Sequence, residues 1–262
     1  MIETNPRPLD GAGILVTRPV RQAAALVSRI AALGGSTIVF PAIAILPPDD
    51  PQPLARAHAA LAEYDYAVFV SANAVEYGAP DRSRWPDGLI AFVPGPGTAQ
   101  ALVDVGIANA RVPSTTFDSE GLLALPELTD VQRRRVIVFR GDGGRELLGD
   151  TLRERGAEVT YVTCYRRAPP QQSSAAGLDE AFAQNRIDAV TITSSEGLDN
   201  LWRIVSDATR RAWRERPTFV PHPRIAERAR ELGLHAVATA GSDAGLVSSL
   251  LEWFAAHPRQ SP

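Results

Sequence analysis

The chain repeats part of itself at a fixed spacing. Residues 14–45 read ILVTRPVRQAAALVSRIAALGGSTIVFPAIAI, and residues 136–167 read VIVFRGDGGRELLGDTLRERGAEVTYVTCYRR. An apolar run is followed by Arg18 in the first copy and by Arg140 in the second, and 140 − 18 = 122. Because solenoid repeats are only about 20–50 residues long, a repeat of this length indicates a duplicated domain.

The similarity continues beyond these two stretches. Residues 67–75 (AVFVSANAV) match residues 189–197 (AVTITSSEG) at the same offset. Residues 92–106 (FVPGPGTAQALVDVG) then match residues 219–233 (FVPHPRIAERARELG), with the offset increased to 219 − 92 = 127. The segments FDSEGLLALPEL and GSDAGLVSSLLEW form a last pair, and each is predicted to open a helix. Each half of the chain is therefore expected to form a complete layered unit.

The hydrophobic pattern predicts the class of these units. The runs GILV, AVFV, VIVF and AVTIT are short and continuously apolar, which is typical of strands buried on both faces of a parallel sheet. The segments between them are amphipathic, with Leu26, Ile30 and Leu33 on one helix face. Gly34 and Gly156 stand where a helix commonly ends in a left-handed residue. Strands alternating with such helices predict two doubly wound α/β domains.

Two proline-rich segments predict how the units are connected. Residues 40–53 (FPAIAILPPDDPQP) and residues 160–174 (TYVTCYRRAPPQQSS) each read as an extended strand that runs into a linker. Two such segments can run side by side between two lobes. Each domain is then discontinuous or exchanged, with a cleft between the lobes.

The loops after the predicted strands hold the candidate binding residues, because ligands of open α/β sheets bind at the carboxyl ends of the strands. These loops are rich in glycine, hydroxyl groups and arginine, which suits an anion. Each loop alone is weak evidence, since serines after strands often cap helices and RGDGGR lacks the GxGxxG spacing of a nucleotide site. The predicted substrate-binding residues are Thr17, Arg18, Ser71, Asn73, Gly95, Gly97, Thr98, Arg140, Gly141, Gly143, Gly144, Arg145, Ser194, Ser195, His222 and Arg224.

The composition excludes several kinds of chemistry. All 27 basic residues are arginine, so lysine Schiff bases and the P-loop lysine are absent. Cys164 is the single cysteine, and the four histidines lack the spacing of metal ligands, so a metal cofactor is not expected. The net charge of −3 gives no general attraction to nucleic acid, and the arginines of segments 133–135 and 210–216 are expected to be solvated surface.

The location follows from two further features of the sequence. No apolar stretch is long enough to cross a bilayer, and the N-terminal residues lack the layout of a signal peptide. A cytoplasmic protein without membrane contact is therefore expected.

Several of these segments resemble one known family. RGDGGRELLGDTLRERGAEVTYVTCYRR, VPGPGTAQAL, FVSANAV and FDSEGLL are similar to segments of uroporphyrinogen-III synthases, and the resemblance extends from about Ile14 to Trp253. It implies two flavodoxin-like domains joined by a two-stranded linker. The first domain would comprise residues 1–42 and 168–262, and the second residues 43–167.

The resemblance also implies an activity. Members of this family are hydro-lyases of haem biosynthesis that close the linear tetrapyrrole hydroxymethylbilane into a macrocycle. They invert the last pyrrole ring and release water without a metal or organic cofactor. The linker tyrosine, here Tyr165, is the candidate for helping the hydroxyl group leave. The acetate and propionate groups of the substrate suit a site built from arginine, amide N–H and hydroxyl groups.

One position departs from the family pattern. Where many relatives carry glycine-proline-threonine-threonine, this chain has HPRI at residues 222–225. Hydroxyl contacts with the substrate are not expected there, and Arg224 would replace them with a carboxylate contact.

The sequence leaves alternatives to this activity open. Two α/β lobes with a cleft also describe a small-molecule-binding or sensor protein without catalysis, whereas a two-lobed sugar transferase usually needs a longer chain. If the chain is a synthase, its partners are the linear tetrapyrrole and, transiently, the enzyme that precedes it in the pathway. A monomer is sufficient for such a site.

Overall fold

A computed structural model describes residues 7–171 and 175–258 of the chain. The chain divides into two compact units. Unit 1 comprises Met1–Ala44 and Ala168–Pro262, and unit 2 comprises Ile45–Arg167. The parts of the predicted first domain at residues 1–6, 172–174 and 259–262 lie outside the described residues, as does the end of the predicted linker segment.

Unit 1 contains a five-stranded sheet with helices on both faces. Its strands are β1 (Gly13–Val16), β2 (Ser36–Val39), β8 (Ala189–Thr191), β9 (Pro217–Val220) and β10 (His235–Ala238). Its described helices are α1 (Val20–Ala32), α8 (Ala175–Ala183), α9 (Ser195–Ile204), α10 (Asp207–Arg214), α11 (Pro223–Glu231) and α12 (Asp243–Ala256).

The strand order in unit 1 is β2-β1-β8-β9-β10, and each neighbouring pair is parallel. Numbered along unit 1, this is the order 2-1-3-4-5 of the flavodoxin-like doubly wound fold. In this topology the order reverses beside β1, which is where such folds bind their ligands. The flavodoxin-like class predicted for this unit is confirmed.

Alternate residues of β1 enter two different cores. Ile14 and Val16 are fully buried in the cluster that contains residues of α1 and α12. Leu15, also fully buried, packs in the cluster that contains residues of α8, α9 and α11. The continuous apolar run GILV is therefore needed because both faces of this strand are covered, and each such aliphatic side chain contributes about 1.5–3 kcal/mol by its burial.

Unit 2 contains a second five-stranded sheet. Its strands are β3 (Ala44–Leu46), β4 (Tyr66–Phe69), β5 (Ile90–Phe92), β6 (Arg135–Gly141) and β7 (Glu158–Ala168). Its helices are α2 (Gln52–Ala59), α3 (Ala72–Gly78), α4 (Pro96–Asp104), α5 (Ser119–Leu123), α6 (Pro126–Thr129) and α7 (Leu147–Glu154), with 3₁₀ turns η1 (Leu61–Glu63) and η2 (Arg82–Arg84).

The second sheet repeats the topology of the first in a permuted chain order. Its order is β3-β7-β6-β4-β5, and the pairs β7-β6, β6-β4 and β4-β5 are parallel. β6 therefore takes the place of β1, β7 that of β2, β4 that of β8 and β5 that of β9. A single parallel bridge between Phe92 and Arg111 marks the place of β10. The sequence repeat is thus a repeat of strand positions.

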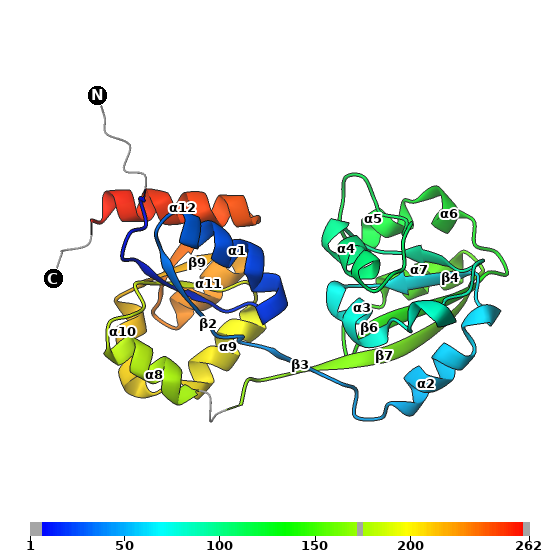
Figure 1. Ribbon diagram of the computed structural model, residues 1–262, viewed down its shortest axis with the longest axis horizontal. Helices are drawn as coiled ribbons and strands as arrows, with labels where there is room; N and C mark the ends of the chain where they lie inside the picture. Colours follow the sequence, from blue (N-terminus) through cyan, green and yellow to red (C-terminus); the bar gives the residue numbers. More distant parts are fainter. Residues whose placement is uncertain (1–6, 172–174, 259–262) are drawn as a thin grey trace. The chain divides into compact units, whose positions relative to one another are not determined.

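Two neighbouring strands carry the chain from one unit to the other (Figure 1). The first boundary falls within β3, after Ala44, and the second falls at the end of β7, after Arg167. β3 lies next to β7 in the sheet. The prediction of a two-stranded linker is therefore confirmed.

The strands of unit 2 alternate between two cores in the same way as β1. In β6, Ile137 and Phe139 pack with residues of α2, α3 and α4, whereas Val136 and Val138 pack with residues of α5, α6 and α7. All four side chains are fully buried.

The prediction of left-handed helix ends also holds in both units, because φ is +91° at Gly34 and +87° at Gly156.

Candidate functional site

The carboxyl ends of the strands in each unit are followed by capped helix N-termini. The capping side chain accepts a hydrogen bond from a backbone N–H of the first helical turn, which satisfies one of the donors left unpaired at a helix start. The caps of this kind that follow strand-end loops are Ser71 on α3, Asp118 on α5, Ser194 on α9, His222 on α11 and Ser242 on α12.

A β-bulge between β6 and β7 places Tyr165. Arg140 pairs with Thr163, but the next residue, Gly141, pairs with Tyr165, so Cys164 is the extra residue. Without the bulge, Cys164 and Tyr165 would face opposite sides of the sheet; with it, both lie in the same core cluster. Tyr165 is 7% exposed.

Gly141 provides the space for the Tyr165 ring. A Cβ at Gly141 would lie 2.8 Å from ring atoms Cε2 and Cζ and 3.2 Å from the hydroxyl oxygen. The centre of the Tyr77 ring lies 6.2 Å from the centre of the Tyr165 ring. The hydroxyl of Tyr77 donates to the carbonyl of Ile45 at 2.9 Å. The Tyr165 ring is therefore held between backbone and a second aromatic ring.

The hydroxyl of Tyr165 meets a second hydroxyl. Its oxygen lies 3.3 Å from Ser71 Oγ, which also accepts from the backbone N–H of Ala74 at 3.1 Å. Ser71 comes from the loop after β4, whereas Tyr165 comes from β7. Two of the predicted site residues, Ser71 and Gly141, thus lie against the predicted catalytic tyrosine.

The side chain of Arg140 contacts a carboxylate and an aromatic ring of unit 2. Its Nη1 donates to Glu146 Oε1 at 2.7 Å, its guanidinium lies 4.6 Å from the centre of the Tyr161 ring, and its side chain is 11% exposed. The hydrogen bond from Arg140 lowers the pKa of the Glu146 carboxyl. At Gly144, where φ is +129°, a Cβ would lie 3.3 Å from Arg140 Nη2. Arg140 therefore stabilises the glycine-rich loop at residues 141–145.

Arg145 forms a bidentate ion pair with Glu120. Its two terminal nitrogens donate to the two carboxylate oxygens of Glu120 at 2.8 and 3.3 Å, and both side chains are largely exposed. Glu120 lies in the first turn of α5, which Asp118 caps by accepting from Gly121 N. A Cβ at Gly121 would lie 1.7 Å from the carbonyl oxygen of Thr116, so only glycine fits this turn. The guanidinium is thus preorganised for a carboxylate.

The GPGT loop opens α4 beside an exposed aromatic ring. Gly95 is the N-cap residue, and a Cβ there would lie 3.2 Å from the Cβ of Phe117, a side chain that is 55% exposed. Gly97 faces open space, as Gly143 does in the neighbouring loop, whereas Thr98 is buried in the helix. Backbone N–H groups of Gly97 and Gly143 are therefore not screened by a side chain of their own.

Asn73 lies in the first turn of α3, two residues after the cap Ser71. Its side chain is half-buried. This places it beside the capped end of the helix, on the same strand-end loop as Ser71.

In unit 1, the loop after β1 is tied to neighbouring elements. Thr17 is buried, and its hydroxyl donates to the carbonyl of Thr191 at 2.6 Å. Arg18 forms an ion pair with Asp243 in the first turn of α12. The Arg145–Glu120 pair of unit 2 likewise joins the loop after β6 to α5, and α12 and α5 begin within the matched segments GSDAGL and FDSEGL, although the repeat matches Arg18 to Arg140 and not to Arg145. Both units therefore join the first strand-end loop to the same helix start.

The other predicted residues of unit 1 lie at helix starts. Ser194 caps α9 by accepting from Gly197 N at 3.0 Å, and Ser195 is the first residue of that helix. Nδ1 of the exposed His222 caps α11 by accepting from the backbone N–H of Arg224 at 3.2 Å. The side chain of Arg224 is exposed. Of this set, the structure shows a mutual contact for His222 and Arg224.

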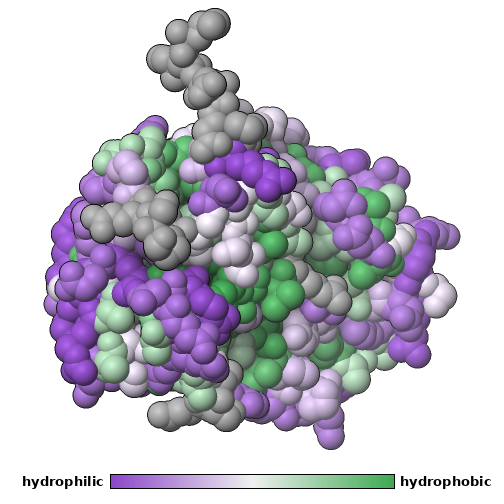
Figure 2. Space-filling model, turned by 60° about the vertical axis from the view of Figure 1, so that its left-hand side comes forward, coloured by the Kyte–Doolittle hydropathy of each residue, from purple (hydrophilic) through white to green (hydrophobic). Residues whose placement is uncertain are grey.

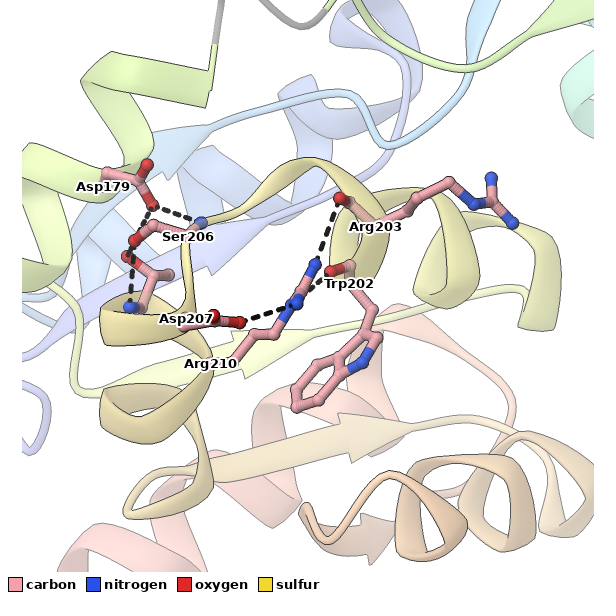
Figure 3. Close-up of polar contacts among 7 residues, drawn as sticks. Asp179, Trp202, Arg203, Ser206, Asp207 and Arg210 are labelled. Atoms are coloured by element: carbon pink, nitrogen blue, oxygen red, sulfur yellow. Dashed lines mark hydrogen bonds and ion pairs between the residues drawn. The ribbon is translucent and has the colours of Figure 1, made fainter.

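Two arginines of segment 210–216 donate hydrogen bonds to backbone carbonyl groups of unit 1, and Figure 3 shows one of them, Arg210. Arg210 donates to the carbonyl oxygens of Trp202 and Arg203 at the end of α9, at 2.8 and 3.2 Å, and to Asp207 at 2.8 Å. Arg216 donates to the carbonyl of Ile187 at 2.6 Å. The expectation of merely solvated arginines was wrong for these two side chains, because they satisfy carbonyl groups.

The sequence missed three parts of the site. Glu120 and Asp243, which hold Arg145 and Arg18, stand in the segments that were matched only as helix starts. Phe117 precedes the cap of α5, and the bulge at Cys164 has no signal in the strand's own residues. The matched FDSEG and GSDAG segments were the signal that points to the first two, since each has a carboxylate in the first turn after its cap.

The described residues contain neither a cluster suited to a metal ion nor a helix suited to span a membrane. No group of three or more histidine, cysteine, aspartate or glutamate side chains in residues 7–171 and 175–258 is arranged to hold a metal ion. In the same part of the chain, none of the helices has the length and apolarity required to cross a membrane. Hydrophilic residues cover much of the face shown in Figure 2.

Comparisons with known proteins agree with this fold. A family model described as uroporphyrinogen-III synthase HemD matches residues 24–247. The uroporphyrinogen-III synthases of Salmonella typhimurium and Escherichia coli are 37% and 38% identical over 227 and 228 residues, each match covering 84% of this chain and 91% of the relative. The solved structure of a mutant uroporphyrinogen III synthase from Thermus thermophilus matches with a TM-score of 0.56 and 20% identity, covering 94% of this chain and 100% of that chain, and it supports the fold. The chain therefore belongs to the uroporphyrinogen-III synthase family, whose members are enzymes of tetrapyrrole biosynthesis.

Proposed function

We propose that this chain cyclises hydroxymethylbilane to uroporphyrinogen III, with Tyr165 as the group that assists departure of the hydroxyl. Family membership supports the reaction. The observation that carries the assignment of Tyr165 is its position at the bulge, where a mostly buried ring brings a phenol hydroxyl to the strand-end loops of unit 2. Tyr161, the other tyrosine of β7, is committed elsewhere, since its hydroxyl accepts from Gly149 N at 3.0 Å.

The chemical step needs one donor at the departing group. The bond between the hydroxymethyl carbon and its oxygen breaks, the phenol proton of Tyr165 moves to that oxygen, and water leaves. The cation that remains is delocalised over the first pyrrole ring, and the last ring attacks it through the α-carbon that already carries the bridge to the third ring. That bridge bond then breaks and forms again at the other α-carbon of the last ring, which inverts this ring and closes the macrocycle. The proton lost from the last ring on closure restores the phenol. General acid assistance of this kind contributes typically about 10²–10⁴-fold.

The substrate carboxylates need donors that are free to receive them. We infer that Arg145 provides an exchangeable contact, because its partner Glu120 is exposed and an exposed ion pair contributes only about 0–1 kcal/mol. The backbone N–H groups of Gly97 and Gly143 would add donors, since nothing lies within 4 Å of a Cβ placed at either residue. The unit 1 loops with Arg18, Ser194 and His222 would bind further acetate or propionate groups.

The remaining residues of the predicted site would hold the binding loops or lie beside the substrate. Arg140 would act mainly by holding the glycine-rich loop, since its side chain is only 11% exposed and pairs with Glu146, whereas that of Arg145 is 63% exposed. Thr17 would act through the loop that it joins to β8. Asn73, Thr98, Gly144, Ser195 and Arg224 are proposed as neighbours of the substrate on the strength of their loop positions alone.

Selectivity is the main task of such an enzyme. The cation formed by loss of the hydroxyl can close unaided to the isomer in which the last ring is not inverted. The enzyme must therefore hold the two ends of the substrate in one geometry, which is where positioning contributes most to the rate. Many donors spread over several loops suit that task better than one strong contact.

The decisive experiment is incubation of the chain with hydroxymethylbilane and separation of the uroporphyrinogen isomers. We expect isomer III in excess, formed faster than the spontaneous reaction. Formation of isomer I alone at the spontaneous rate would contradict the proposal and would leave a two-lobed binding or sensor protein as the interpretation. A cytoplasmic location and a transient contact with the preceding pathway enzyme remain predictions.

A further inference from the structure

Ser71 has two hydrogen-bond partners within the protein. Its Oγ accepts from the backbone N–H of Ala74 at 3.1 Å and lies 3.3 Å from the hydroxyl oxygen of Tyr165. A serine hydroxyl has one hydrogen to donate and two lone pairs to accept. With one lone pair committed to Ala74, the direction of the contact with Tyr165 decides where the phenol proton points.

Only one direction leaves the phenol proton available. If Tyr165 donates to Ser71, its proton points into the protein. If Ser71 donates to Tyr165, the Tyr165 O–H is free to donate to a departing hydroxyl, and its oxygen already accepts one hydrogen bond. A hydrogen bond to an oxygen that gains negative charge is stronger than one to a neutral oxygen.

We propose that Ser71 is a positioning residue for Tyr165: its hydroxyl donates to the phenol oxygen and stabilises the negative charge that develops there as the phenol proton moves to the leaving group. This inference rests on the proposed role of Tyr165. It replaces the direct substrate contact that the sequence predicts for Ser71. The serine proton stays on serine throughout, and the phenol regains its proton when the ring closes.

The surroundings favour this role over a structural one. The other neighbours of the Tyr165 ring are not in a position to serve, since Gly141 has no side chain and the Tyr77 hydroxyl donates to Ile45. Because 3.3 Å is long for an O–H···O bond, we expect the contact to shorten when substrate and charge are present, as catalytic hydrogen bonds often do.

The cap alone does not require this geometry. Ser206 caps α10 by accepting from Thr209 N at 3.2 Å, and its hydroxyl also lies 3.0 Å from Asp179 Oδ1 and 3.3 Å from Thr209 Oγ1 (Figure 3). Ser206 therefore provides a matched control: Ser206→Ala removes a serine cap of similar geometry without touching a phenol.

The test is a double-mutant cycle in the full chain with Ser71→Ala, Tyr165→Phe and the combined variant. We expect Ser71→Ala to lower kcat about tenfold or more with little change in KM, and to lower it no further once Tyr165→Phe is present. Ser71→Thr, which keeps the hydroxyl, should restore kcat, and Ser206→Ala should lower the melting temperature by a similar amount with kcat unchanged. If Ser71→Ala does not fold, Ser71→Gly serves, since glycine is tolerated at caps.

The outcomes separate this inference from the proposed function. An increase in KM with kcat unchanged, or an equal loss in the Tyr165→Phe background, would show that Ser71 acts directly on the substrate and would overturn the inference. A slow Tyr165→Phe with a fully active Ser71→Ala would overturn the inference alone. A fully active Tyr165→Phe would overturn both.

Discussion

Gly141 and the ring of Tyr165 are in contact across a β-bulge, and no side chain can stand between them. A Cβ at residue 141 would lie 2.8 Å from two ring carbons, closer than such contacts occur. Gly141, which the sequence predicts as a substrate-binding residue, therefore leaves room for the ring of the catalytic candidate.

Gly141→Ala should displace the Tyr165 ring and lower kcat by about tenfold or more, because a shift of about 1 Å in a catalytic group can cost about 10²-fold. Steady-state kinetics with hydroxymethylbilane measures it. Gly177→Ala is the control, since Gly177 lies in α8 with nothing within 4 Å of its added Cβ. Equal kcat values for Gly141→Ala and the wild-type chain would show that the ring position does not matter.

Arg145→Ala should raise KM about tenfold with a smaller effect on kcat, as expected for loss of a hydrogen-bonded carboxylate contact. Glu120→Gln should instead lower KM about two- to fivefold, because it removes the carboxylate that competes for the same guanidinium. Arg140→Ala serves for comparison: it should raise KM and also lower the melting temperature, since the glycine-rich loop loses its support. An unchanged KM in Arg145→Ala would place this arginine outside the substrate site.

His222→Ala should destabilise unit 1 by about 1 kcal/mol, the usual cost of removing an N-cap. His222→Asn should retain most of the stability, because the amide oxygen also accepts from the first helical turn. Urea unfolding followed by circular dichroism measures both. Equal losses in the two variants would mean that the ring contributes by packing rather than by the bond from Arg224 N.

Cys164 should make the free energy of unfolding decrease in alkaline solution. Burial raises the pKa of its thiol to about 12, against about 8.5 in an unfolded chain. Above pH ~8.5 the unfolded state loses this proton while the folded state keeps it, so stability is full below that pH and falls by roughly 2 kcal/mol near pH 10.

Urea unfolding near neutral pH and near pH ~10 measures this effect, with Cys164→Ala as the variant that lacks the thiol. The decrease between the two conditions should be smaller in Cys164→Ala than in the wild-type chain. Identical decreases would mean that the thiol does not contribute. The folded wild-type chain should also react slowly with maleimides at neutral pH, since the thiol is buried and protonated.

The architecture could be predicted from the sequence because it depends on repeated local patterns. The 122-residue offset between Arg18 and Arg140 relates β1 to β6, and the apolar runs at both places are buried on both faces. The left-handed conformations of Gly34 and Gly156 followed from helix-end chemistry. These features each depend on a few neighbouring residues.

The finer geometry of the site could not be predicted because it depends on contacts between distant residues. The bulge at Cys164 exists only in the pairing of β7 with β6. The Arg145–Glu120 and Arg18–Asp243 pairs join residues far apart in the chain. The same limit explains why Arg140 was expected to meet the substrate, whereas Glu146 and Tyr161 occupy its guanidinium.

The central claim is that this chain closes the macrocycle with Tyr165 as the donor to the departing hydroxyl. Its most direct test is the rate of isomer III formation by Tyr165→Phe, compared with the wild-type chain at saturating hydroxymethylbilane. We predict a decrease in kcat of about 10²-fold, larger than for removal of any other single hydroxyl, with the folded structure retained. A kcat equal to that of the wild-type chain would contradict the account.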